Sequence, residues 1–389
     1  MEIIGGEGAC FETPQGRWLD LGSLIYQMNA GHGRQDIVEA VKAQADRLCI
    51  SLPGAVYPEK RALAERLLQA APAGFDRVFF TLGGSDAVEN AIKMARLYTG
   101  RHKTISRYRS YHGATMGAVG LSGDWRRRKV EPTLPGAVHV LEPDWVATDT
   151  DELTRIPEVM HHEGEVGAVF AEPIVGGNGV RIPPKGYFAA LREACDEHGA
   201  LLVADEVLTG FGRTGRMFAI EHSEGVVPDM ITLGKAITAG YGTLGAVLVH
   251  ERVSAHFDQE VLACGLTHYG HPLAVAAGLA AIDVYESEGL PARAAAMEPI
   301  LLAALEEVAK VNPRVSLRTR AIGLLGALDL EMSAQQWSSF KTGLARRRVH
   351  AHINARIGTI ILSPPLCITE QELRAGCQSI AEAIREAVA

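Results

Sequence analysis

The chain has 389 residues, of which 47% are hydrophobic and 22% are charged, and its formal net charge is −8. The length is enough for two lobes around a large core, and the acidic balance favours neither nucleic acid nor an anionic membrane surface as a partner. Six cysteines without a Cys-x-x-Cys pair, no recognisable signal peptide and no bilayer-length apolar run favour a cytoplasmic protein with free thiols.

The N-terminal part of the chain predicts a hairpin followed by helices. Residues 11–21 form the predicted hairpin, with its turn at Pro14 to Gly16. A loop over 22–33 follows, and helical spacing of apolar residues then covers 36–48 and 59–71.

From about residue 77 the pattern alternates between strands and helices. The predicted strands are 78–81, 103–107, 137–141, 167–171, 201–204, 230–233 and 245–249. Such alternation predicts a mostly parallel sheet with helices on both faces. The densest basic run, Arg126 to Lys129, fits a solvated helix face, and the alternative that it flanks a site for an anionic ligand stays open.

The C-terminal third does not show the regular alternation of strands and helices. Its predicted elements are helices over 272–286, 292–310 and 370–388 and strands over 315–318, 324–330 and 359–362. This pattern predicts a smaller α+β domain, which the N-terminal hairpin completes.

A glycine-rich turn, Gly83 to Asp86, stands between a predicted strand and a predicted helix. Glycines there let backbone N–H groups approach a ligand, and a helix N-terminus favours an anion. The turn therefore suits a phosphate monoester, with the hydroxyl of Ser85 as an additional donor. Ser85 as the N-cap of an ordinary strand–turn–helix is the alternative.

The stretch from Leu201 to Lys235 carries the chemistry. The predicted strand 201–204 ends in Asp205, and the strand 230–233 ends in Gly234-Lys235. Ligands of open α/β sheets bind at the carboxyl ends of the strands, so a small molecule can lie between this acid and this amine. Pyridoxal phosphate (PLP) suits the pair, because its aldehyde needs an amine and its ring nitrogen needs an anion. A solvated lysine and a strand-end acid are the alternative.

Together with the loop Thr209 to Gly215, these motifs resemble the class III PLP-dependent aminotransferases, which include the ω-transaminases. The resemblance covers the chain from about Phe11 to its C-terminus. It implies an α/β protein with the aspartate aminotransferase-like PLP fold type I, whose large domain has a seven-stranded, mostly parallel sheet beside a smaller α+β domain. The domains expected from it are 1–35, an N-terminal segment that joins the small domain, 36–272, which binds PLP, and 273–389, the C-terminal small domain.

The resemblance also implies the residues around the cofactor. They are Gly84, Ser85, Tyr111, His112, Glu172, Asp205, Val207, Lys235 and Thr267. Lys235 and Asp205 are the expected catalytic residues: Lys235 bonds the aldehyde and then shuttles the α-proton, and Asp205 keeps the ring nitrogen protonated. Tyr111 and Val207 are expected on the two faces of the ring. Glu172 is expected near the cofactor, with a plain strand-end acid as the alternative.

The run Cys264 to Pro272 resembles a family motif whose threonine crosses a dimer interface. The resemblance therefore implies a homodimer with active sites at the interface, in which Thr267 contacts the phosphate of the other subunit. His268 and His271 lack a carboxylate or cysteine partner at ligand spacing, so no metal site is expected.

Five positions bear on the substrate. Tyr26 is expected at the pocket edge, with a packing aromatic as the alternative. Leu208 stands where several ω-amino acid enzymes have a glutamine, and Ile361 stands where many relatives have a fixed arginine clamp. Arg356 resembles the mobile arginine of amine–pyruvate transaminases, and Arg320 is a competing candidate.

The expected function is transfer of an amino group from an amine or ω-amino acid to a keto acid, with pyruvate as the expected acceptor, or to an aldehyde, by a ping-pong mechanism. A PLP-dependent aminomutase, racemase or decarboxylating transaminase would use the same lysine and acid, and a non-catalytic binding relative is the alternative from another class.

Overall fold

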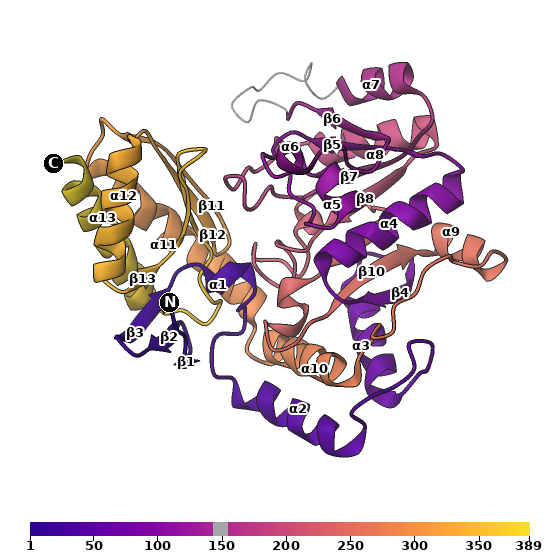
Figure 1. Cartoon of the computed structure of the whole chain (residues 1–389), viewed down its shortest axis with the longest axis horizontal. Helices are drawn as coiled ribbons and strands as arrows, with labels where there is room; N and C mark the ends of the chain where they lie inside the picture. Colours follow the sequence, from indigo (N-terminus) through magenta and orange to yellow (C-terminus); the bar gives the residue numbers. More distant parts are fainter. Residues whose placement is uncertain (143–154) are drawn as a thin grey trace.

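The computed structural model describes residues 1–142 and 155–389. Figure 1 shows a larger unit built around a central sheet and, beside it, a smaller unit that holds both chain termini. Side chains from both units line one cavity.

The central sheet has seven strands in the order β4-β10-β9-β8-β7-β5-β6. They are β4 (Phe75–Thr81), β5 (Lys103–Arg107), β6 (Ala137–Val140), β7 (Val166–Ala171), β8 (Leu201–Asp205), β9 (Met230–Leu233) and β10 (Gly245–His250). β10 runs antiparallel to both of its neighbours, β4 and β9, and the other adjacent strands of the described sheet pair in parallel. The predicted seven-stranded, mostly parallel sheet is therefore confirmed. β7, β8 and β9 are buried along their whole length, as unbroken apolar runs predict for strands covered on both faces.

The helices of the larger unit cover the two faces of this sheet or pack against the helices that do. They are α2 (Gln35–Arg47), α3 (Pro58–Ala70), α4 (Gly84–Thr99), α5 (Met116–Leu121), α6 (Arg127–Val130), α7 (Arg155–Glu163), α8 (Tyr187–His198), α9 (Glu251–Ser254) and α10 (Pro272–Ser287), with 3-10 turns η2 (Ala219–His222), η3 (Lys235–Thr238) and η4 (Ala255–Asp258). The apolar stripe of α4, which includes Val88, Ala91 and Ala95, packs across several strands and orients the first turn of the helix toward the carboxyl end of β4.

The smaller unit is built on a four-stranded antiparallel sheet in the order β11-β12-β15-β14. Its strands are β11 (Ser316–Ile322), β12 (Leu325–Leu330), β14 (His352–Asn354) and β15 (Thr359–Leu362), and its helices are α11 (Leu290–Lys310), α12 (Ala334–Arg346) and α13 (Glu370–Val388). The helix α12 was absent from the sequence prediction. Its signals are a capping box between Ser333 and Gln336 and a buried stripe that includes Trp337, Phe340 and Leu344.

The predicted N-terminal hairpin is present and joins the smaller unit. Strands β1 (Gly5–Glu7), β2 (Cys10–Thr13) and β3 (Gly16–Asp20) form one sheet, and β3 pairs in parallel with β13 (Val349–His350). The short turn α1 (Ser23–Tyr26) then leads the chain toward the larger unit.

The helix α10 packs against α2 and α3 of the larger unit (Figure 1). We therefore propose a domain boundary after α10, near Gly289, instead of the expected one between residues 272 and 273.

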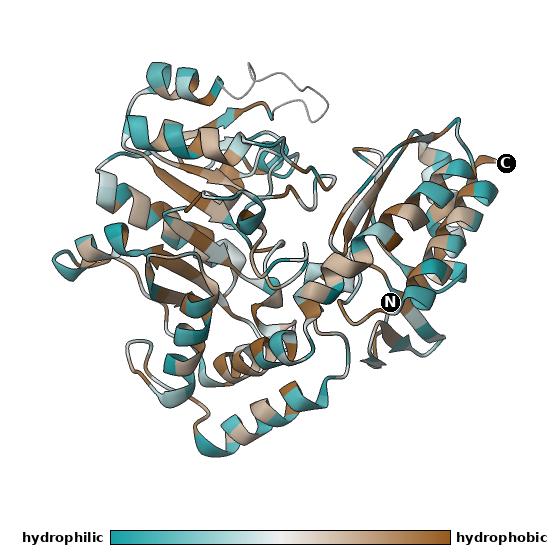
Figure 2. Ribbon diagram, turned by 180° about the vertical axis from the view of Figure 1, so that it is seen from behind, coloured by the Kyte–Doolittle hydropathy of each residue, from teal (hydrophilic) through white to brown (hydrophobic). Residues whose placement is uncertain are grey.

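Figure 2 shows hydrophobic residues concentrated along the strands of both units and hydrophilic residues on the outer helices. Within the described ranges, no helix combines the length and the apolar character needed to cross a lipid bilayer.

Candidate active site

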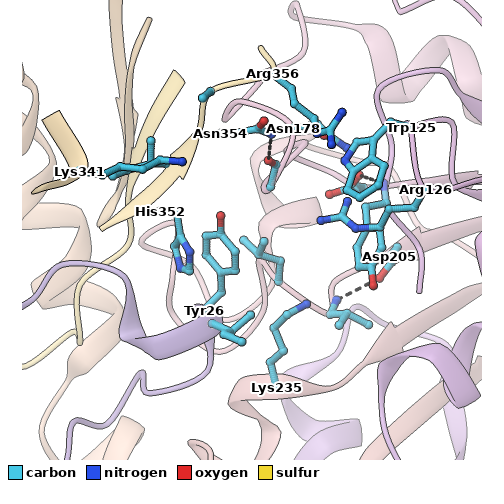
Figure 3. A pocket seen from close by; sticks show the side chains of 18 residues that line it. Tyr26, Trp125, Arg126, Asn178, Asp205, Lys235, Lys341, His352, Asn354 and Arg356 are labelled. Carbon is cyan, nitrogen blue, oxygen red and sulfur yellow. Dashed lines mark hydrogen bonds between the residues drawn. The ribbon is translucent and has the colours of Figure 1, made fainter. Parts of the chain in front are cut away.

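A cavity of about 510 Å³ brings together seven of the residues predicted from the sequence. They are Tyr26, Tyr111, Glu172, Asp205, Val207, Lys235 and Arg356. Figure 3 shows Lys235 and Asp205 at the base of this cavity, with Tyr26 and His352 on one wall and Trp125 and Arg126 on the other. The carboxyl ends of the central strands supply the base, as expected for an open α/β sheet.

Asp205, the last residue of β8, is a buried carboxylate held by three donors. One oxygen lies 2.6 Å from Nδ1 of His112, and the other accepts from the hydroxyl of Thr232 at 3.0 Å and from the backbone N–H of Val207 at 3.1 Å. These contacts fix the carboxylate in one orientation toward the cavity. The other ring nitrogen of His112, Nε2, is buried without a partner among the described residues.

Lys235 begins η3 directly after β9 and has a φ of 42°, a strained value for a residue other than glycine. Its amine has no hydrogen-bond partner in the described part of the chain and faces the cavity (Figure 3). Burial lowers the pKa of this amine, while the carboxylates of Asp205 and Glu172 oppose the shift. The amine is therefore closer to a neutral nucleophile than a solvated lysine is.

The start of α4 lies against the end of β9. A Cβ added to Gly234 would lie 2.9 Å from the backbone N of Gly84, so only glycine allows this approach. No side chain caps the first turn of α4, which leaves backbone N–H groups for an anion. The hydroxyl of Ser85 accepts from the backbone N–H of Ala114 at 3.1 Å, which ties this turn to the loop after Tyr111.

Glu172 follows β7 and is buried beside Asp205. Its carboxyl accepts from the backbone N–H of Tyr111 at 3.1 Å and from that of Gly176 at 3.0 Å, and burial raises its pKa. The group therefore positions the Tyr111 loop.

These features fit PLP. Lys235 offers an unpaired amine, Asp205 offers a fixed carboxylate, and the uncapped turn of α4 offers N–H donors for a phosphate. The buried Nε2 of His112 has no hydrogen-bond partner among the described residues, so the site contains a polar atom that a ligand could satisfy.

Tyr26 reaches the cavity from a strained turn. Ser23, Leu24 and Tyr26 all have positive φ, at 48°, 54° and 61°. The buried carboxylate of Asp20 offsets this strain by accepting from the backbone N–H groups of Gly22 at 3.0 Å and Leu24 at 2.8 Å.

The ring of Tyr26 is fixed by His352, whose own ring stacks on it with centroids 3.8 Å apart. Burial raises the pKa of the Tyr26 hydroxyl, so this side chain is uncharged at neutral pH.

Arg356 and Arg126 lie on the two sides of Trp125 (Figure 3). The guanidinium carbon of Arg356 is 4.1 Å from the centre of an indole ring, and that of Arg126 is 5.2 Å from it. Arg126 also lies over the ring of Tyr111 at 4.6 Å. Within residues 1–142 and 155–389, Arg356 has no ion-pair or hydrogen-bond partner, so it is free to change position.

Arg320 is placed differently from Arg356. It does not line the cavity, and its guanidinium makes two bonds to Asp329, at 2.7 and 2.8 Å, and further bonds to the carbonyls of Gly179 and Val180. These contacts give it a structural role, in which it links β11 and β12 to the loop at Gly179 and Val180. Thr267 is exposed and also lies outside the cavity lining, so its contact with the phosphate of another subunit stays a prediction.

Leu208 and Ile361, the two apolar positions noted in the sequence, lie in one hydrophobic cluster. Leu208 lines the cavity and packs so closely on Gly176 that a Cβ there would lie 2.4 Å away from it. Ile361 is fully buried in a cluster with Tyr26 and Leu208 and does not reach the cavity.

Among the lining residues that were not predicted as site residues, six carry polar or aromatic side chains: Trp125, Arg126, Asn178, Lys341, His352 and Asn354. For Arg126 the sequence carried a signal, since the basic run was noted as a possible flank of an anion site. Lys341 lies on α12, the helix absent from the prediction.

Comparison with known proteins agrees with this geometry. The family model for class III aminotransferases matches residues 3–384. Acetylornithine aminotransferase from Methanopyrus kandleri is 37% identical over 98% of this chain and 94% of its own. An omega-aminotransferase from Caulobacter vibrioides is 34% identical over 95% and 90%, respectively. A solved structure of taurine:2-oxoglutarate aminotransferase from Bifidobacterium kashiwanohense, in complex with PLP and glutamate, superposes with a TM-score of 0.93 at 38% identity and covers 98% of this chain and 92% of that one. The chain therefore belongs to the class III aminotransferases, a PLP-dependent enzyme family with PLP fold type I.

Proposed function

We propose that this aminotransferase moves nitrogen from an amine or ω-amino acid to a keto acid in two successive half-reactions. The observation that carries the proposal is the cavity itself. A desolvated lysine and a fixed carboxylate lie at its base, and an unpaired arginine, Arg356, lies at its mouth. The base suits the chemistry of nitrogen exchange, and the mouth suits an acidic substrate that alternates with an amine.

PLP, when bound, supplies an electron sink that makes the proton on the substrate's reacting carbon removable. Asp205 would hold the ring nitrogen, and His112 keeps its carboxylate in position. The uncapped turn of α4 and Ser85 would hold the phosphate. Nζ of Lys235 is the group that we expect to take the proton from the reacting carbon, because burial favours its neutral form.

The residues at the mouth of the cavity support alternate binding of a charged keto acid and an uncharged amine. Arg356 is exposed and stacks on Trp125 instead of pairing with an acid. A buried, fixed arginine would be left uncompensated by an apolar amine. Ile361, at the expected place of such an arginine, lies in the apolar core instead. Arg356 can engage a carboxylate in one half-reaction and withdraw in the other.

The test follows the nitrogen. Purified enzyme with PLP is incubated with a ¹⁵N-labelled amine and unlabelled pyruvate, and the label in alanine is measured by mass spectrometry. The expected result is label in the amino acid, and release of one equivalent of the donor's aldehyde or ketone per active site when the acceptor is omitted. Isomerised amine without an acceptor, or carbon dioxide released from the donor, would instead assign the enzyme to the mutase or decarboxylating members of the family. Absence of any exchange with a broad set of donors would overturn the proposal.

A further inference from the structure

We propose that Tyr269, Asp86 and Asn90 are positioning residues for the phosphate of the cofactor. They fasten the segment that carries Thr267 to the first turn of α4, so one set of contacts holds two segments that are each expected to meet a phosphate. None of the three lines the cavity. Their role is independent of which substrate donates or accepts nitrogen.

The carboxylate of Asp86 lies at the centre of these contacts. Asp86 is the third residue of α4, and one of its oxygens accepts from the backbone N–H of Leu82 at 2.9 Å, which closes the turn in front of the helix. Its other oxygen accepts from the amide of Asn90 at 3.0 Å and from the hydroxyl of Tyr269 at 3.2 Å. Both oxygens are therefore used, and each ties a different part of the chain to the start of the helix.

Asn90 and Tyr269 are buried, so their polar contacts are shielded from water. The amide of Asn90 donates to the backbone carbonyl of Asp86 at 2.8 Å and to the hydroxyl of Tyr269 at 2.9 Å. Burial is the main cause that raises the pKa of Tyr269 to about 12, so its hydroxyl keeps a proton to donate to Asp86 at neutral pH. The ring of Tyr269 also packs edge-on against Phe79 of β4, with centroids 5.2 Å apart. Polar contacts and packing therefore hold this side chain together.

Tyr269 is the buried anchor of an exposed segment. The side chains from Val261 to His268 are exposed or half-buried, and Tyr269 is the next residue in the chain. Its backbone N–H donates to the carbonyl of Leu266 at 3.2 Å, which closes a turn around Thr267. The position of Thr267 therefore depends on a contact two residues away, and that contact is made with the helix whose first turn is expected to hold a phosphate.

The first turn of α4 has little room to move without losing its place at the site. A Cβ added at Gly84 would lie 2.5 Å from the side chain of Val207, the residue expected against one face of the PLP ring. Donors that are fixed in advance bind an anion more tightly than donors that must first be ordered. Loss of a contact that orders this turn should therefore weaken the hold on the phosphate and leave the rest of the site intact.

The test compares PLP with pyridoxal, which has the same ring and aldehyde but no phosphate. Each is titrated into the full-length enzyme after its cofactor has been removed, and binding is followed by absorbance. Tyr269→Phe keeps the ring and removes only the hydroxyl. We expect this variant to bind PLP about threefold to tenfold more weakly, the range for one hydrogen bond, and pyridoxal with unchanged affinity. Tyr98→Phe is the matched control, because it removes a hydroxyl from the opposite end of α4, and it should change neither affinity.

Asp86→Asn separates positioning from charge. Removal of a negative charge near a bound phosphate should, by electrostatics alone, strengthen PLP binding. The amide has one oxygen in place of two, however, so it cannot accept from the backbone of Leu82 and from the hydroxyl of Tyr269 at the same time. We therefore expect Asp86→Asn to bind PLP about threefold to tenfold more weakly and pyridoxal as the wild-type enzyme does.

Thr267→Val and Tyr269→Phe are combined to test the fastening of Thr267. If Tyr269 acts through the segment that carries Thr267, the double variant loses less PLP affinity than the product of the two single losses. Two fully independent losses refute the inference, and so does tighter PLP binding by Asp86→Asn. Equal weakening of PLP and pyridoxal also overturns it, because that result is the sign of a general loss of structure. Unchanged PLP affinity in Tyr269→Phe would show that the hydroxyl does not position the phosphate.

Discussion

Asp205 and Lys235 differ in how tightly the surrounding chain holds them. Three donors fix the carboxylate of Asp205, whereas the amine of Lys235 has no partner among the described residues and loses hydration instead. A rigid anion is suited to hold one protonation state of a bound ring, and a desolvated amine is suited to gain and lose a proton. The two residues therefore need different tests.

Lys235→Ala should lower nitrogen transfer by at least about 10²–10⁴-fold, the range for loss of a positioned proton-transfer group. Reduction with borohydride should attach PLP covalently to the wild-type chain but not to this variant, as intact mass would show. PLP should still bind to the variant through the phosphate contacts. Lys341→Ala is the matched control, because Lys341 also lines the cavity but lies away from its base. The chain of this variant should still gain the mass of the cofactor. Covalent attachment in Lys235→Ala would mean that another lysine reacts.

Asp205→Ala should lower turnover on the order of a thousandfold while Lys235 still reacts with PLP. An ion pair at ~4 Å with an effective dielectric constant of about 20 is worth about 4 kcal/mol, at about tenfold in rate for each 1.4 kcal/mol. Glu206→Gln is a useful control, since the buried carboxyl of Glu206 bonds to the backbone N–H of Ile220 and lies outside the cavity lining. Single-turnover rates measure the effect, and near-normal rates in Asp205→Ala would show that another acid serves the ring.

Arg356→Ala should weaken the use of a keto acid such as pyruvate by about 1.5–3 kcal/mol in kcat/KM, the range for a charged hydrogen bond. Deamination of an uncharged amine should hardly change, because Arg356 is free to leave the cavity. The two half-reactions are measured separately in single turnovers. An equal loss in both, or no loss in either, would assign the carboxylate to Arg126 or another group. Arg320 is a poor candidate for that role, since Asp329 already engages its guanidinium.

At the scale of elements, the strands were predictable because short apolar runs that end at glycine-rich turns are typical of buried strands. The predicted strand 201–204 and β8 differ only by Asp205, the residue that carries the chemistry. The substrate wall was less predictable. Trp125 comes from a turn, Lys341 from α12 and His352 from β14, and only the placement of the smaller unit beside the larger one brings them to one cavity. No local period in a sequence encodes that contact.

The turn that carries Tyr26 should couple folding stability to pH. Burial is the main cause that lowers the pKa of His352 to about 4 from 6.5; His350 and Arg213 lower it further, while the carbonyl of Gly22 and Asp20 oppose the shift. The unfolded chain therefore binds a proton between about pH 6.5 and pH 4 that the folded chain does not, so stability falls as pH is lowered through this window. The loss from this residue at pH 5 is about 2 kcal/mol.

Urea unfolding at pH 7.5 and pH 5 measures this effect. His352→Phe keeps a ring against Tyr26 but cannot take up a proton, so its unfolding free energy should depend less on pH by about the same amount. His139, whose pKa is also lowered to about 4 by burial, lies far from this turn in the larger unit and should keep its own contribution. An unchanged pH dependence in His352→Phe would show that the ring is already protonated in the folded enzyme.

At the scale of the whole molecule, we propose that a second copy of the chain completes the phosphate side of the site. Thr267 is exposed, and apolar side chains near it in the chain are exposed as well, including Val261 at 89% and Leu266 at 45%. The loop before α3 adds Leu52 at 75%, and the hydroxyl of Tyr57 donates to the carbonyl of Gly270 at 2.6 Å, which joins the two segments. Clustered exposed apolar side chains of this kind mark an interaction surface. They support the proposal of a homodimer in which this surface meets the phosphate turn of the partner.

The last prediction tests whether Thr267 serves the other subunit. Thr267→Val removes one hydroxyl donor and should weaken PLP binding by about tenfold to a hundredfold, while Lys235→Ala should be inactive on its own. In a hybrid of the two variants, one of the two sites combines Lys235 from one chain with Thr267 from the other and is complete. Mixing the variants at limiting PLP, with subunit exchange, should therefore restore activity to a substantial fraction of the wild-type level, because a complete site retains its cofactor where both parents fail. Mixing Lys235→Ala with Asp205→Ala is the control. Lys235 and Asp205 line one cavity from the same chain, so each site of that hybrid carries one of the two substitutions and no activity should return. Recovery in neither mixture would place Thr267 in the site of its own chain or outside the site altogether.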